Sequence, residues 1–214
     1  MKKPLFLLVC FLFFLSDSFS QVFGKVYEID SLKEIIASHK LVAVIPFNYK
    51  ITLKKMPKNT TEEDIRRQEE KGSLSAQNSF YTYALKKVEK KEVTVDLQDI
   101  SRTKVLLLRD SISEKNISNY LPEELCQKLG VDAIITGDII ASQPMSEGAA
   151  VATQLLVGFS KTNQAKATIK VYGGTGKLLW SYGKEVSGGL GSDDDDMIRV
   201  LMRKTANRFP YFKE

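Results

Sequence analysis

Two apolar runs constrain the fold of this chain more than any other feature. Residues 41–47 (LVAVIPF) are apolar throughout, and residues 131–140 (VDAIITGDII) form a second run of strand length. The continuous apolar run at 41–47 is typical of a strand buried on both faces, as at the centre of a parallel or mixed sheet. Pro46 stands where this strand ends, a position that tolerates proline. Residues 131–140 predict a second strand, with one face formed by Val131, Ala133, Ile135, Gly137 and Ile139.

A long helix is predicted after the first run. Thr60-Thr61-Glu62-Glu63 matches a capping box, and residues 62–71 are mostly charged and expected to be solvated. Gly72 is expected to kink or divide this helix. From Leu74 onward the apolar residues recur at helical spacing, so we expect the buried face to start there. That face is predicted to hold Leu74, Tyr81, Leu85 and Val88, flanked by Phe80 and Ala84.

Two shorter helices are predicted before the second run. Residues 98–112 form the first, and its inward residues are expected to be Ile100, Val105, Leu107 and Leu108. Residues 121–129 form the second, with Pro122 near its start and Gly130 as its end. Residues 93–95 are expected to form a short strand.

The C-terminal third indicates an antiparallel hairpin followed by a helix. Residues 167–172 alternate apolar and polar side chains, residues 173–176 (GGTG) form a turn, and residues 178–182 return. Ser192 and Asp195 are expected to cap the last helix. Its buried side is predicted to hold Met197, Ile198, Leu201, Thr205 and Phe209. The predicted fold class is thus α/β: an α+β sandwich with helices packed on a mixed sheet that includes a C-terminal antiparallel hairpin.

The first twenty residues have the features of a secretory signal peptide. Lys2 and Lys3 precede an apolar run at 5–15 that is too short to span a bilayer, and small residues follow it. We expect cleavage after Ser20 and a periplasmic or secreted protein. Cys10 follows Val9, which is too large for a lipidation signal, so lipidation at Cys10 is not expected. After the signal peptide at 1–20, we expect a lead-in segment at 21–40 and a single α/β domain at 41–214.

Composition excludes some functions and leaves others open. Cys126 is the only cysteine outside the signal peptide, so packing must hold the fold without an internal disulfide. The net charge of +5 suits either ordinary solubility or contact with an anionic envelope surface. Nucleic acid is not an expected partner, because the chain has no basic-aromatic stripe and no known binding motif.

The order of these segments resembles a known family of envelope domains. The pieces that carry the resemblance are VAVIPF, LGVDAIITGDI and TGKLLW, within residues 41–209. They are similar to the periplasmic domain shared by the curli-secretion lipoprotein (CsgG-like), the penicillin-binding-protein activator lipoprotein and the TolB amino-terminal domain. These are structural motifs, so they bear on the fold more than on chemistry. The resemblance implies a non-enzymatic module that binds envelope proteins or assembles into rings.

The residues that could form a chemical site each have a structural explanation. The run at 173–177 (GGTGK) lacks the spacing of a phosphate-binding loop and lies between strands, so a hairpin turn is favoured. Four aspartates at 193–196 lack the calcium-loop spacing and suit a helix N-terminus. His39 is expected on the surface, and Cys126 is expected to be a half-buried structural thiol. Asp132 and Asp138 are about 20 Å apart along a strand, which is too far for an acid–base pair. We expect no enzymatic activity, no cofactor and no metal site.

Residues 145–164 are the segment in which function is most visible. Large apolar side chains alternate there with small or polar ones, as in a membrane strand. An ordinary core strand, or a helix from Ser146 onward, is the favoured interpretation, and an exposed partner-binding patch lies between the two. The predicted partner or membrane surface comprises Met145, Val151, Leu155, Val157 and Phe159. Our leading hypothesis is a secreted periplasmic envelope module that binds a partner protein or self-associates as a homo-oligomer. The alternatives are a membrane-associated secretion or assembly component of the curli-pore type, and an envelope enzyme or small-ligand binder.

Overall fold

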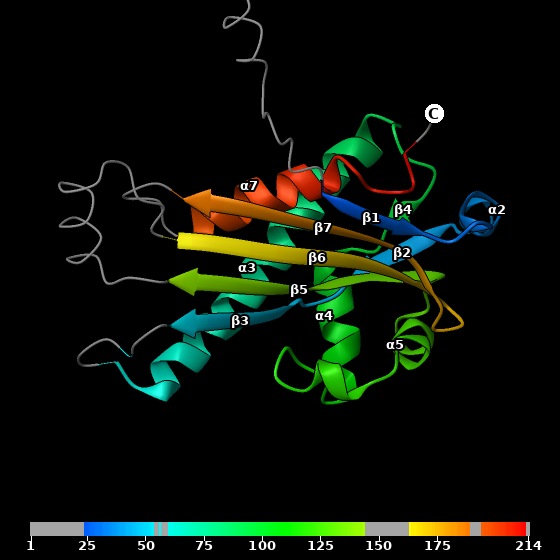
Figure 1. Cartoon of the computed structure of the whole chain (residues 1–214). Coiled ribbons are helices and arrows are strands. Elements are labelled where there is room, and N and C mark those ends of the chain that lie inside the picture. Colours follow the sequence, from blue (N-terminus) through cyan, green and yellow to red (C-terminus); the bar gives the residue numbers. More distant parts are fainter. Residues whose placement is uncertain (1–23, 54–55, 57–59, 144–162, 189–193, 213–214) are drawn as a thin grey trace, which may run out of the picture.

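The protein is an α/β fold built on one seven-stranded mixed sheet, which confirms the predicted class (Figure 1). The computed structural model describes residues 24–53, 56, 60–143, 163–188 and 194–212. The sheet order is β1-β7-β6-β5-β2-β4, and β3 also pairs with β5. The strands are β1 (Lys25–Glu28), β2 (Leu41–Val44), β3 (Asn48–Leu53), β4 (Asp96–Leu97), β5 (Ala133–Gln143), β6 (Asn163–Gly173) and β7 (Leu178–Gly188). The helices are α2 (Leu32–Ala37), α3 (Glu62–Glu89), α4 (Ile100–Arg109), α5 (Pro122–Leu129), α7 (Asp194–Ala206) and the short 3₁₀ helix η2 (Ile117–Asn119).

Strands β2 and β3 lie one after the other along the same edge of β5. Val44 stands opposite Ile135, and Asn48 stands opposite Asp138. Val44 and Asn48 are thus four residues apart, whereas their partners on β5 are three residues apart. One extra residue at Pro46 is the signature of a β-bulge, where proline is tolerated because ladder pairing is interrupted. The predicted buried strand is confirmed at β2. The prediction that a helix comes next is wrong, because β3 intervenes.

Helix α3 holds this strand edge through polar side chains. Glu69, Ser73 and Gln77 are four residues apart and so share one face of the helix. Glu69 accepts a hydrogen bond from the backbone N–H of Ile51 at 3.0 Å, Ser73 donates to the carbonyl of Phe47 at 2.6 Å, and Gln77 donates to that of Val44 at 2.7 Å. The buried polar residues on α3 are therefore satisfied by backbone groups that would otherwise lack partners.

The predicted inner face of α3 is shifted around the helix. The buried residues are Gly72, Ser73, Ala76, Gln77, Phe80 and Ala84, whereas Leu74, Tyr81, Leu85 and Val88 are only partly buried. Gly72 does not interrupt the helix. Instead it allows close packing, since a Cβ there would lie 2.7 Å from the ring of Tyr49. The capping box is also one residue later than predicted, with Thr61 and Asp64 as its members.

Helices cover the two faces of the sheet unequally. The larger core lies beneath α2, α3 and α7 and includes Phe80, Ile139, Trp180 and Leu201. The smaller core lies beneath α4 and α5 and includes Ala43, Leu125 and Ile134. In α4 only Thr103 and Leu107 are buried, so the prediction that Val105 and Leu108 point inward is wrong; they are 50% and 52% exposed.

The chain ends are joined to the sheet by long-range contacts. β1 pairs antiparallel with β7, and it lies in the lead-in segment at 21–40, for which the sequence predicted no helix or strand. The strand predicted at 93–95 reduces to a single bridge between Val93 and Phe212, and β4 begins at Asp96. The predicted hairpin is confirmed by β6 and β7, with Gly176 at φ +78 in the turn. Within the described ranges, no helix is long and apolar enough to cross a membrane.

Candidate functional site

The sheet has one broad surface that the described helices do not cover. α3 and α7 lie behind the sheet in Figure 1, and α4 and α5 reach only part of the opposite side. The strand registers place one set of outward side chains together on that opposite side, and we call this set the open face. It comprises Asn48, Lys50 and Thr52 of β3, Asp138, Ile140 and Ser142 of β5, Lys166, Thr168 and Lys170 of β6, Ser181 and Glu185 of β7, and Tyr27 of β1.

Three ion pairs cross the open face or its margin. Lys50 pairs with Glu69 at 3.1 Å, Lys166 with Glu185 at 3.4 Å and Lys170 with Asp138 at 2.6 Å. These pairs hold long side chains in fixed positions between neighbouring strands. The surface therefore presents ordered, mostly neutralised charges, together with the exposed side chains of Tyr27 and Ile140.

The Asp138–Lys170 pair is the most protected of the three. Asn48 Nδ2 also donates to Asp138, at 2.9 Å. Burial alone would raise the pKa of Asp138, but the hydrogen bonds from Lys170 and Asn48 outweigh it and hold the pKa below its ordinary value. The same pair raises the pKa of Lys170 despite burial. Both groups thus stay charged at neutral pH, which suits binding more than proton transfer.

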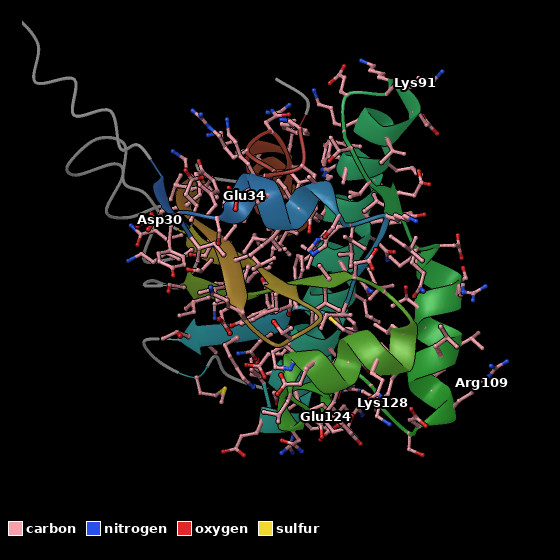
Figure 2. The ribbon with its side chains drawn as sticks, turned by 90° about the vertical axis from the view of Figure 1, so that its right-hand side faces the viewer. Asp30, Glu34, Lys91, Arg109, Glu124 and Lys128 are labelled. Atoms are coloured by element: carbon pink, nitrogen blue, oxygen red, sulfur yellow. The ribbon has the colours of Figure 1, made fainter. Side chains whose placement is uncertain are left out.

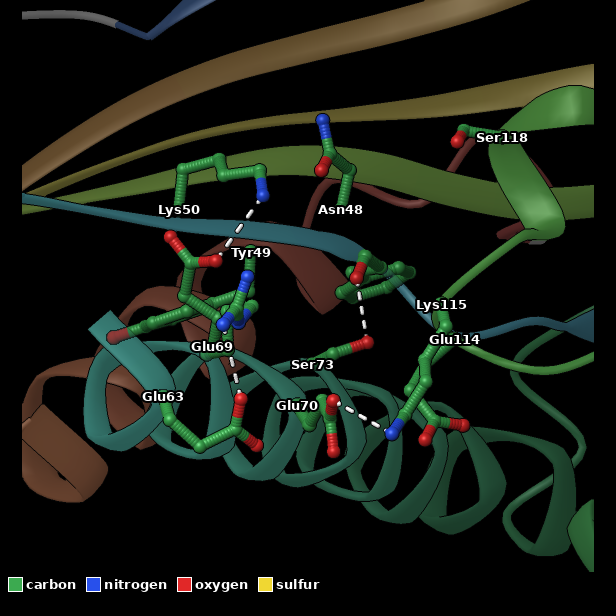
Figure 3. A pocket seen from close by; sticks show the side chains of 12 residues that line it. Asn48, Tyr49, Lys50, Glu63, Glu69, Glu70, Ser73, Glu114, Lys115 and Ser118 are labelled. Atoms are coloured by element: carbon green, nitrogen blue, oxygen red, sulfur yellow. Dashed lines mark hydrogen bonds and ion pairs between the residues drawn. The ribbon is translucent and has the colours of Figure 1, made fainter. Parts of the chain in front are cut away.

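A charged hollow of about 360 Å³ adjoins the open face where β3 meets α3 (Figure 3). Glu63, Glu69 and Glu70 enter it from α3, and Lys115 reaches it from the loop before η2. Lys115 pairs with Glu70 at 3.0 Å, which raises the pKa of Lys115. Each of the three glutamates is ion-paired with a cation, since Glu63 also contacts Arg66 at 3.0 Å. The lining described here holds no histidine or cysteine.

A second hollow of about 260 Å³ lies beside the first, and the two share Asn48 and Ser118. It lies between the β5–β6 surface and the start of α5, with Tyr120, Pro122 and Tyr172 in its lining. The bulge at Pro46 therefore stands at the edge of a continuous depression, as bulges beside binding sites commonly do. Mixed apolar walls with a few fixed polar groups are typical of a surface that binds side chains of a partner.

The residues that the sequence offered for catalysis are used to hold the fold. His39 Nδ1 is hydrogen-bonded to the hydroxyl of Tyr211 at 2.7 Å, and His39 is partly buried, whereas the sequence predicted a surface residue. Asp132 accepts hydrogen bonds from the backbone N–H groups of Lys40 and Leu41, at 2.7 and 2.9 Å. Cys126 is fully buried, not half-buried, and burial raises its pKa to about 11. A thiol with so high a pKa is unreactive at neutral pH.

His39, Asp132, Cys126 and Tyr211 are nevertheless near one another. Asp132 affects the pKa of each of the other three, and Cys126 also affects that of Tyr211. The ring of His39 contacts Tyr211, and the nearby carboxylate disfavours the thiolate, so this is not a nucleophile–base pair. In the part of the chain that the structure describes, no three His, Cys, Asp or Glu side chains are placed to hold a metal ion.

The predicted partner surface, which comprises Met145, Val151, Leu155, Val157 and Phe159, lies outside the residues that the structure describes. The open face was missed as a site, although its signal was present in the sequence. Apolar and polar side chains alternate in residues 164–172, and the polar ones lie on the side of β6 that belongs to the open face.

The fold and the open face define an α/β sandwich with one exposed sheet surface. No family model and no curated protein matches the chain. Among solved structures, it is similar to lipoprotein GNA1162 from Neisseria meningitidis, with 12% identity, 78% of this chain and 94% of that chain covered, and a TM-score of 0.46. It is also similar to the PelC dodecamer from Paraburkholderia phytofirmans, with 11% identity, 89% and 98% covered, and a TM-score of 0.46. A further similar structure is the LpoB C-terminal domain from Escherichia coli, with 9% identity and a TM-score of 0.32. The match covers 73% of this chain and 93% of the LpoB chain. At these identities and scores the likenesses assign no function to this chain.

Proposed function

We propose that the chain is an exported, non-catalytic envelope module that binds a protein partner, or a second copy of itself, through the open face. The observation that carries this proposal is the exposure of Ile140 between the ion-paired Lys50 and Lys166, together with that of Tyr27 at the sheet edge. Ile140 is 45% exposed and Tyr27 is 50% exposed. Aromatic and aliphatic residues within a polar surround are the usual composition of a protein interface.

The open face is smaller than a standard interface. Its members lie within 138–142 of β5, 166–170 of β6 and 181–185 of β7, a length of roughly 17 Å at about 3.3 Å per residue. Five strands at a spacing of about 4.8 Å span roughly 20 Å. The resulting area, on the order of 350 Å², is below the roughly 800 Å² that each partner buries in a standard complex, so a partner of that size would also cover the adjoining hollows.

The absence of catalysis is part of the proposal and rests on how the reactive groups are engaged. Ser73 donates to a backbone carbonyl, His39 is hydrogen-bonded to Tyr211, and the α3 glutamates Glu63, Glu69 and Glu70 of the charged hollow are ion-paired. General acid–base work needs a group with a free proton position aimed at a substrate. These groups are instead committed to structure.

Site-specific photo-crosslinking in the source cells tests the proposal. A photoreactive phenylalanine analogue replaces Thr168 at the centre of the open face, and a matched control replaces Lys104, which is exposed on α4. We expect a discrete crosslinked protein from position 168 and none from position 104. Adding Ile140→Glu should abolish the adduct. Equal adducts at both positions, or an adduct that survives Ile140→Glu, would contradict the use of this face.

Light scattering on the purified chain 21–214 separates the two kinds of partner. A defined oligomer that Ile140→Glu converts to monomer indicates self-association, and a monomer indicates a different protein. The alternative of a membrane-associated assembly component depends on residues 145–164, which lie outside the described residues. It predicts an oligomer that stays dispersed only in detergent and that is insensitive to Ile140→Glu.

A further inference from the structure

Two short segments of this chain each carry an excess of positive charge. Residues 83–92 and 203–212 together contain seven Lys and Arg and two Glu, a net charge of +5.

The fold brings the two segments to one end of the molecule. The first ends α3 and the second ends α7, and these helices pack side by side (Figure 1). Phe80 of α3 contacts Phe209 edge-on, with ring centroids 5.8 Å apart, and Val93 forms a β-bridge with Phe212. Lys87 Nζ lies 5.4 Å from the centroid of the Phe212 ring. Segments that are more than a hundred residues apart in sequence thus form one surface, which we call the basic end.

Most cations of the basic end are exposed and have no ion pair within the described residues. Lys87 is the exception, since it pairs with Glu92 at 2.6 Å. The others are Lys86, Lys90, Lys91, Arg203, Lys204 and Arg208. Figure 2 shows Lys91 projecting from the end of α3 at the margin of the molecule. The helix dipole favours a cation or two in a last turn. It does not account for six exposed cations without an ion pair at one end of the described part of the chain.

Two aromatic rings lie among these cations. Tyr83 and Phe212 are both partly buried. Lys86 Nζ lies 5.5 Å from the centroid of the Tyr83 ring, and Lys87 Nζ lies over the Phe212 ring in the same way. A lysine ammonium thus lies over one face of each ring, where it would obstruct the stacking that a single-stranded nucleic acid uses. Lysines beside partly buried aromatics suit the interface of a charged bilayer, because lysine stems and aromatic rings are both amphipathic groups that face such an interface.

We propose that the basic end is a docking surface for anionic phospholipid bilayers. Cations without protein partners would approach the lipid phosphates, and the open face on the strands would remain available to a protein. The attraction is electrostatic, so it falls as the Debye length shortens with added salt. This inference is independent of the proposed partner, because it uses different residues and a different ligand.

Vesicle flotation with the chain 21–214 tests the inference. Vesicles of phosphatidylcholine alone are compared with vesicles that also contain phosphatidylglycerol. We expect binding only to the anionic vesicles, and its loss in high salt. Lys90→Glu, Lys204→Glu and Arg208→Glu combined should weaken binding by more than about tenfold, because each cation near the surface contributes measurably to attraction.

A matched variant controls for net charge. Arg102→Glu, Lys104→Glu and Arg109→Glu make the same charge change on the exposed side of α4. Circular dichroism melting confirms that both variants fold. Equal loss in the two variants would overturn the basic end as the site, and so would equal binding to neutral vesicles. Binding to a DNA duplex but not to anionic vesicles would also overturn it.

Discussion

The side-chain amide of Gln77 donates a hydrogen bond to the backbone carbonyl of Val44 across 2.7 Å, although the two residues are 33 positions apart. Both groups are buried. The contact fixes the middle of α3 against the edge of β2, at the bulge that begins the open face.

Replacing Gln77 by leucine should therefore destabilise the fold. The substitution puts an apolar side chain of similar size in place of the amide and leaves the Val44 carbonyl buried without its donor, at a cost of about 1–3 kcal/mol. Urea unfolding followed by circular dichroism measures this loss. Asn78→Leu serves as the control, because Asn78 is the exposed neighbour on the same helix, and its change should be within about 0.5 kcal/mol. Similar losses in both variants would contradict a specific role for Gln77.

Gly72→Ala should destabilise the protein, contrary to helix propensity. Alanine gains roughly 1 kcal/mol over glycine in an exposed helix. Here the new methyl group would lie 2.7 Å from the ring of Tyr49, so the ring or the helix must move. We expect a net loss of roughly 1–3 kcal/mol, as in overpacked cores. Gly72→Ala should cost less stability when Tyr49 has already been replaced by leucine than when the Tyr49 ring is present. A stabilised Gly72→Ala single variant would contradict the close packing.

Stability should fall in mild acid because of His39. Burial lowers the pKa of His39 below the ordinary 6.5, and the opposing attraction of Asp132 is smaller. Since the unfolded chain binds the proton more tightly, the contribution of His39 is complete above pH 6.5 and declines as the pH falls toward the folded-state pKa. Urea midpoints measured across this window should drop. The His39→Gln variant should lack this component, and identical pH profiles for the two proteins would contradict it.

The Asp138–Lys170 pair should contribute modestly to stability. The side chain of Asp138 is 44% exposed, so solvent screens the pair and its coupling should be roughly 0.5–1 kcal/mol. A double-mutant cycle with Asp138→Asn and Lys170→Met measures it. Because the pKa of Asp138 is lowered, this stabilisation is present above its unfolded value of 3.8 and is lost below it. The more exposed Lys166–Glu185 pair should give a smaller coupling, and the reverse order would contradict the difference in burial.

The sequence predicted the elements whose patterns are local. The strands at β2 and β5, the hairpin of β6 and β7 and the compact helix α5 each follow from apolar spacing and turn residues. Gly130 ends α5 with φ +65, a left-handed conformation that glycine adopts without strain, so the end of this helix could be predicted from the residue type.

The rest depended on partners far away in the chain. Ser73 and Gln77 are polar, so periodicity placed them outside, but backbone groups 26 and 33 residues earlier make them buried residues. Leu108 is apolar, so periodicity placed it inside, but no described element covers it. The open face required the strand registers, which the alternation of one strand cannot supply.

The bulge at Pro46 sets the phase of everything that follows it on that edge. Val44 and Asn48 are four residues apart, whereas their partners Ile135 and Asp138 are three apart, so a regular strand of period two would turn Tyr49 away from the core. The bulge absorbs the odd residue, and Tyr49 therefore stays buried while Lys50 stays on the open face. The inserted residue thus corrects parity, and it lets two segments of opposite phase share one strand edge.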